Sequence, residues 1–189
     1  MLPFIRFSIV AALVTLISCE KGHLEIYEEP ITSMSLVFQP DSEQVVVLSY
    51  LDSDGIGGLR AIQNDVILNS NTTYNCELII NNQTPLALPR LLHVIDSGSV
   101  TNRPELHQVF YESDSQLQLK TTYRDQDING NPVGFMTTIE TGGLSRGKLV
   151  VSVIHAPNKT ASDVASGKPA RAGGTLDLRV EFDIQIAYE

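Results

Sequence analysis

The chain has 189 residues and a formal net charge of −9, and 42% of its residues are hydrophobic. This length and composition are sufficient for one globular domain with a core of its own. The acidic balance argues against nucleic acid as a partner, because binding to phosphates requires a basic surface.

The first 18 residues have the pattern of a bacterial export signal. Arg6 precedes an uncharged apolar run at 7–17, which is too short to cross a bilayer as a helix. The run ends in Leu16-Ile17-Ser18-Cys19, which resembles the bacterial lipobox. The resemblance implies a signal peptide at 1–18 and a diacylglycerol on the Cys19 thiol, and two or more acyl chains anchor a protein stably. The alternative is an ordinary secretory signal followed by a chance cysteine.

Residues 19–30 are predicted to be the lipidated cysteine and a tether. In lipoproteins of enteric bacteria, an Asp directly after the cysteine favours the inner membrane. Glu20 stands there instead, so the resemblance implies an anchor in the outer membrane. The acidic residues that follow match only in part the cluster that sends some Bacteroidetes lipoproteins to the cell surface. The periplasmic face and the surface face both stay open.

From residue 31 onward the dominant hydrophobic period is two, which is typical of β-strands. The run at 176–186 is the clearest, with Leu176 and every second residue after it apolar. Similar runs lie at 31–38, 44–51, 72–81, 107–112, 116–124, 133–140 and 148–155. We therefore expect residues 31–189 to form a single antiparallel β-sandwich, immunoglobulin-like in general form, with about seven to nine strands. A barrel is the alternative.

Two other features of this region carry predictions. Cys76 lies in an apolar-rich run, where a lone cysteine is most often a small buried hydrophobe. Residues 156–175 have no apolar period, and loops of this length are usually functional or disordered. This loop contains Lys159 and Arg171 in an otherwise acidic chain. Together with His155 at its start, they are candidate contacts for an anionic ligand.

Asp125-Gln-Asp127-Ile-Asn129-Gly130 resembles the start of a calcium-binding loop, and Asp52-Ser-Asp54-Gly55 repeats its first part. Hard cations such as Ca²⁺ are bound by several oxygen ligands in a tight turn. Neither run has the glutamate that an EF-hand requires at its twelfth position. A calcium site of another kind at the two hairpin tips is one interpretation. The other is that Asp, Asn and Gly are simply the residues that turns require.

Two histidines are candidate ligands for zinc or copper. His155 shares strand parity with Val151 and Val153, which places it at the end of the core-facing row. His107 begins another predicted strand and reaches the same end if that strand runs in the right direction. Imidazole is a common ligand of both metals. Since no two histidines stand at a ligand spacing in the sequence, histidines satisfied by the backbone are the alternative.

Asp125-x-Asp127-x-Asn129-Gly-Asn-Pro and His155-Ala-Pro-Asn-Lys159 are also similar to motifs of small uncharacterised β-sandwich lipoproteins of Bacteroidetes. The resemblance covers most of the predicted mature domain and implies an exported binding or accessory protein, beside an outer-membrane receptor or transporter. Motifs of nucleophilic catalysis such as Gly-x-Ser-x-Gly are absent, so we expect no enzyme. A structural or adhesive sandwich without a small ligand is the alternative function.

Overall fold

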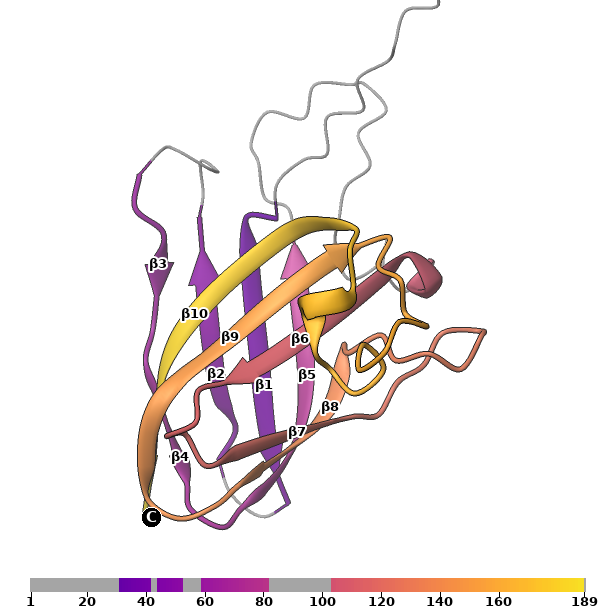
Figure 1. The fold of residues 1–189 in the computed structure, drawn as a ribbon. Coiled ribbons are helices and arrows are strands. Elements are labelled where there is room, and N and C mark those ends of the chain that lie inside the picture. Colours follow the sequence, from indigo (N-terminus) through magenta and orange to yellow (C-terminus); the bar gives the residue numbers. More distant parts are fainter. Residues whose placement is uncertain (1–30, 42–43, 53–58, 82–102, 189) are drawn as a thin grey trace, which may run out of the picture.

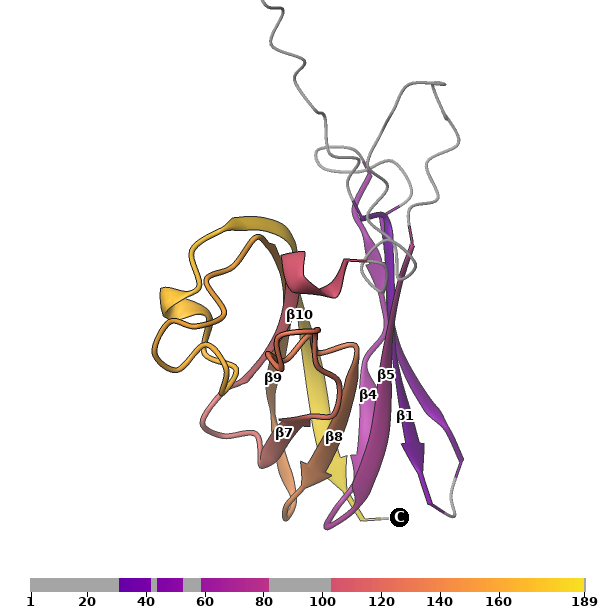
Figure 2. The ribbon, with the colours of Figure 1, turned by 90° about the vertical axis from the view of Figure 1, so that its right-hand side faces the viewer.

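The computed structural model describes residues 31–41, 44–52, 59–81 and 103–188, and these residues form two facing β-sheets. In Figure 2, β1 and β5 of one sheet lie on one side of the view, and β9 of the other sheet lies on the opposite side with the long loop after it. Within these residues, no helix is long and apolar enough to cross a membrane.

The larger sheet has six strands in the order β3-β2-β1-β5-β8-β7, and each pair of neighbours is antiparallel. Its strands are β1 (Ser33–Pro40), β2 (Val46–Leu51), β3 (Ile62–Gln63), β5 (Thr73–Asn81), β7 (Leu119–Tyr123) and β8 (Met136–Thr141).

The smaller sheet has four strands in the order β4-β10-β9-β6 and crosses obliquely in front of the larger one in Figure 1. Its strands are β4 (Val66–Asn69), β6 (His107–Ser113), β9 (Ser145–His155) and β10 (Thr175–Ala187). A single turn of 3₁₀-helix, η1 (Pro104–Leu106), precedes β6, and a second turn, η2 (Pro169–Arg171), lies in the loop before β10.

The predicted all-β sandwich is confirmed, and each run of alternating residues became a strand with ends shifted by a few residues. The described residues contain ten strands instead of seven to nine, because β3 and β4 have only two and four residues and are too short to show a period. One short strand, β4, departs from the antiparallel pairing of the other strands. This strand pairs parallel to β10, from which it is remote in the sequence.

The core lies between the two sheets. It consists of every second residue along the strands, whose side chains point inward. Phe38, Phe182 and Leu149 are fully buried there, and the Phe38 and Tyr74 rings meet edge to face with centroids 5.8 Å apart. Cys76 also lies in this core, and burial raises the pKa of its thiol to about 12. The predicted role of Cys76 as a small buried hydrophobe is confirmed, since such a thiol is inert at neutral pH.

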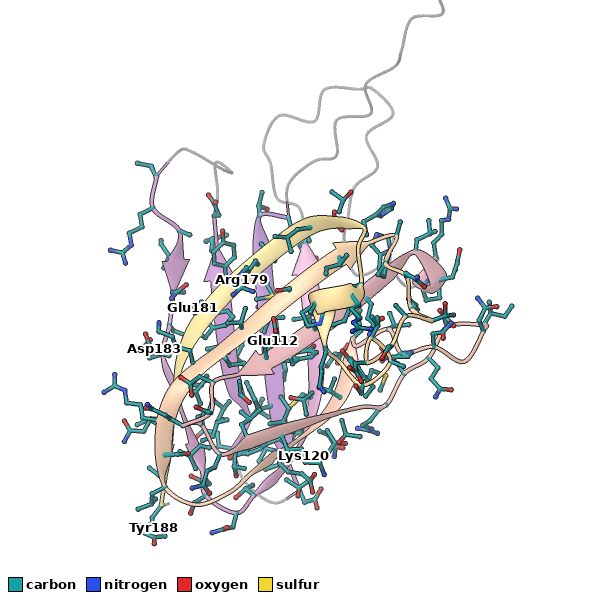
Figure 3. The ribbon with its side chains drawn as sticks, in the orientation of Figure 1. Glu112, Lys120, Arg179, Glu181, Asp183 and Tyr188 are labelled. Carbon is teal, nitrogen blue, oxygen red and sulfur yellow. The ribbon has the colours of Figure 1, made fainter. Side chains whose placement is uncertain are left out.

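The outer face of the smaller sheet is divided between a packed loop and a charged surface. The loop 156–174 covers the ends of β6 and β9, where Phe110, Ile154, Val164 and Ala172 form a second apolar cluster. Gln108 donates to the carbonyl of Val164 at 2.9 Å and helps to hold the loop in place. Farther from the loop this face carries Glu112 of β6 and Arg179, Glu181 and Asp183 of β10, which Figure 3 labels. The long loop therefore packs against the outer face of the smaller sheet. Its sequence, which has no hydrophobic period, did not reveal this packing.

Candidate metal centre

His107 and His155 face each other at one end of the smaller sheet. His107 is the first residue of β6 and His155 is the last of β9, and the antiparallel register pairs them directly. Nδ1 of His155 and Nε2 of His107 are 3.0 Å apart, and the two rings are inclined at 73°. Since β6 runs antiparallel to β9, the condition for the predicted meeting of these histidines is fulfilled.

The close approach of the two rings has a chemical consequence. A nitrogen–nitrogen contact of this length is a hydrogen bond, so one imidazole donates a proton and the other accepts it. His107 is completely buried and His155 is half-buried, so water competes little for this proton. A divalent metal can take the place of the shared proton, because neutral imidazole binds metals through the lone pair of a ring nitrogen.

Asp177 is the third member of the group, which we call the histidine cluster. One ligand atom from each of His107, His155 and Asp177 lies within 4.8 Å of the other two. The register of β10 against β9 shifts between Leu176 and Leu178, so that Asp177 is the extra residue of a β-bulge. A bulge re-aims a side chain that strict alternation would send to the other face. Asp177 therefore reaches the histidines although the alternation assigned it to the solvent face.

The turn before β10 also contributes to this geometry. Gly173 and Gly174 both have positive φ, at 59° and 75°. A Cβ on Gly174 would collide with the carbonyl oxygen of His155, so only glycine permits the chain to return this close to the end of β9. The close return places the start of β10, and with it Asp177, beside His155.

The dimensions of the histidine cluster fit a tetrahedral metal ion. Zn–N bonds of about 2.0–2.1 Å at the tetrahedral angle separate neighbouring ligand nitrogens by about 3.3 Å. The observed separation of 3.0 Å between His107 and His155 requires an opening of a few tenths of an ångström. The ligand atom of Asp177 lies within 4.8 Å of those of both histidines, so the carboxylate would have to move closer to join them on one ion. Three protein ligands would leave one coordination position open.

The predicted calcium ligands Asp125, Asp127 and Asn129 lie in one turn. Backbone N–H groups of this turn and of the residues after it donate hydrogen bonds to the carboxylates of Asp125 and Asp127. Asp125 accepts the backbone N–H groups of Gly134, Phe135 and Met136 at 2.7–3.0 Å. Asp127 Oδ1 accepts the N–H groups of Asn129 and Asn131, both at 2.9 Å. This arrangement favours turn chemistry, the alternative to a calcium site. A cation would have to displace these donors.

Lys159 completes a second polar group, which we call the lysine clamp: Lys159, Asp127 and the carbonyl of Pro104. The ammonium lies 3.0 Å from Asp127 Oδ2 and 2.7 Å from the Pro104 oxygen. The side chains of Lys159 and Asp127 are only 4% and 1% exposed. Burial alone would raise the pKa of the Asp127 carboxyl, but the N–H groups of Asn131 and Asn129 and the Lys159 ammonium lower it below its ordinary value. The Lys159 ammonium is thus engaged within the protein, and its predicted contact with an external anionic ligand stays a prediction.

The other predicted site residues lie apart from the histidine cluster or beyond the described residues. Arg171 is exposed in η2, on the loop that covers the smaller sheet. Asp52 follows β2, and one of its carboxylate oxygens accepts the hydroxyl of Tyr50 at 3.2 Å. The signal peptide, Cys19, the tether and Asp54 all lie outside the described residues.

Asp177 is the residue that the sequence did not single out. The apolar row predicted for 176–186 included Leu176, but this residue is 55% exposed because the bulge interrupts the alternation beside it. The glycine pair just before the strand was the available signal, since glycines at a strand end often accompany irregular pairing.

Comparisons of the chain with protein-family models, with curated proteins and with solved structures gave no match. The geometry of the described residues is therefore the basis for the function proposed below.

Proposed function

We propose that the protein is a lipid-anchored binding protein of the bacterial envelope that holds a divalent transition metal at His107, His155 and Asp177. The observation that carries this proposal is the convergence of the three side chains. Two imidazole nitrogens lie 3.0 Å apart, and an Asp177 oxygen lies within 4.8 Å of a ring nitrogen of each histidine. These residues come from three neighbouring strands, so a rigid sheet holds their spacing.

The ligand set supports zinc or copper(II). Imidazole nitrogen suits both metals, whereas calcium takes six to eight oxygen ligands. Three protein ligands leave a position for water or for a group of another molecule. We propose a role in binding and handing over the metal, as an accessory protein beside an outer-membrane receptor or transporter, and no catalysis.

Metal titration of the full chain in detergent tests the site. Zinc and copper(II) are expected to bind with one equivalent per chain, and calcium is expected not to compete. His107→Ala and His155→Ala are each expected to abolish binding. His23→Ala, in the predicted tether, is the matched control and should bind as the wild type does. If the wild type binds neither metal, the proposal is wrong and the structural or adhesive alternative is favoured.

The anchor requires its own experiment. In the producing bacterium, Cys19→Ala is expected to prevent acylation and to release the protein from the membrane fraction or leave it unprocessed. Detergent partitioning combined with mass spectrometry of the N-terminal peptide measures this directly. A Cys19→Ala chain that partitions like the wild type would contradict the lipid anchor and leave the metal site untouched.

A further inference from the structure

We propose that Lys159 is a positioning residue for the metal site and that it acts through the carbonyl of Pro104. This inference rests on the proposed function. Lys159 would contact neither the metal nor the imidazole ring of either histidine. The lysine clamp would set the distance between His107 and His155, and thereby the affinity and geometry of the bound metal.

The first observation is a shared acceptor. The Pro104 oxygen accepts the backbone N–H of His107, which closes η1, and it also accepts the ammonium of Lys159 at 2.7 Å. Among the described residues, no side chain forms a capping hydrogen bond at the N-terminal end of η1. A single 3₁₀ turn of this kind has little stability of its own. The Lys159 ammonium therefore restrains η1, the turn that directly precedes His107.

The second observation is that Lys159 is itself immobilised. Its ammonium contacts Asp127 Oδ2 at 3.0 Å, and the backbone N–H groups of Asn129 and Asn131 hold the other oxygen of that carboxylate. A lysine side chain normally samples many rotamers. Burial of both partners and two acceptors for one ammonium restrict it to a single position here.

The third observation connects η1 with both histidines. The N–H of Ala156, directly after His155, donates to the carbonyl of Leu106, directly before His107, at 2.6 Å. A displacement of η1 would therefore shift the two imidazoles relative to each other. Metal–ligand distances tolerate only about 0.2 Å of deviation, so such a shift would weaken binding and distort the coordination.

The test compares two paired substitutions in the full chain. Lys159→Met with Asp127→Asn removes the clamp without leaving a buried charge, and the asparagine oxygen can still accept the turn N–H groups. Lys120→Met with Glu140→Gln is the matched control, because this 2.8 Å ion pair between β7 and β8 is exposed. The measurements are the zinc dissociation constant and the electron paramagnetic resonance spectrum of bound copper(II).

The clamp variant is expected to fold and to bind zinc about 10- to 100-fold more weakly than the wild type, the usual loss when a residue that orients a ligand is changed. Its copper(II) spectrum should differ from that of the wild type, and the control variant should match the wild type in both measurements. If the clamp variant keeps the wild-type affinity and spectrum, the positioning role is wrong while the metal site stands. If the wild type binds no metal, both proposals fail.

If the clamp variant does not fold, hydrogen exchange of the wild-type chain decides the question. Zinc is expected to slow amide exchange at 125–131 and 156–160 as well as at the three ligands, because clamp and site would open together. Slower exchange confined to the ends of the strands that carry the ligands would overturn the positioning role.

Discussion

The histidine cluster and the lysine clamp contain similar chemical groups in different arrangements. In the clamp, the protein's own N–H groups and ammonium surround the Asp127 carboxylate. In the histidine cluster, two ring nitrogens face each other and a carboxylate approaches both. The comparison shows that an acidic run such as 125–129 does not by itself mark a cation site, because nearby N–H groups already donate to its carboxylates. The turn at 125–131 has the more suggestive sequence, and the strand ends have the more suggestive geometry.

The largest expected effect on stability comes from removing only one of the two charged side chains of the lysine clamp. Lys159→Met leaves the Asp127 carboxylate buried without a counter-charge and should lower the free energy of unfolding by about 3–5 kcal/mol. Urea unfolding monitored by circular dichroism measures this loss. Lys120→Met serves as the control, since Lys120 is 74% exposed and its ion pair should contribute less than about 1 kcal/mol. Equal losses in the two variants would show that the clamp is no more structural than a surface ion pair.

The next prediction distinguishes the histidine cluster, which is proposed to bind metal, from the lysine clamp, which is expected to stabilise the fold. Asp177→Ala should weaken zinc binding by more than about 100-fold, because even changes outside the ligand set cost 10–100-fold. The same substitution should change the free energy of unfolding by less than Lys159→Met does, since it removes a carboxylate, whereas Lys159→Met leaves one buried without its counter-charge. Calorimetric titration with zinc measures the affinity, and urea unfolding measures the free energy of unfolding. Unchanged zinc affinity in Asp177→Ala would remove this residue from the proposed ligand set.

A smaller effect tests the turn interpretation of Asp125. Asp125→Ala leaves the N–H groups of Gly134, Phe135 and Met136 without their acceptor. The free energy of unfolding should fall by about 1–3 kcal/mol, and zinc affinity should stay at the wild-type value. Calcium should bind neither protein. Calcium binding by the wild type that Asp125→Ala abolishes would restore the calcium interpretation of the hairpin tip.

The smallest effect is the pH dependence of the clamp. The folded pKa of Asp127 lies below its ordinary value, so ionised Asp127 stabilises the fold. This contribution is complete above the unfolded pKa of about 3.9 and is lost as the pH falls through the folded pKa. The wild type should therefore exceed Asp127→Asn in unfolding free energy at neutral pH, and the difference should shrink below about pH 4. Urea unfolding from pH 7 to pH 3 checks this. A constant difference across that range would show that the charge of Asp127 is irrelevant.

The sequence by itself determined the all-β class and the position of most strands, because alternation of apolar and polar residues is a local property of a strand. It also placed His155 at the end of a core-facing row, since parity along one strand requires no knowledge of its neighbours. The lipobox at Cys19 and the envelope location stay predictions of the sequence.

Tertiary structure alone decided which residues meet. The pairing of His107 with His155 depends on the direction and register of β6 against β9, which involve residues 48 positions apart. Asp177 joins them through a bulge, an irregularity that alternation cannot express. Lys159 and Asp127 are 32 positions apart, and their ion pair forms only because the long loop folds back over the smaller sheet. These contacts are set by register and packing between segments remote in sequence, so no local pattern of residue types could specify them.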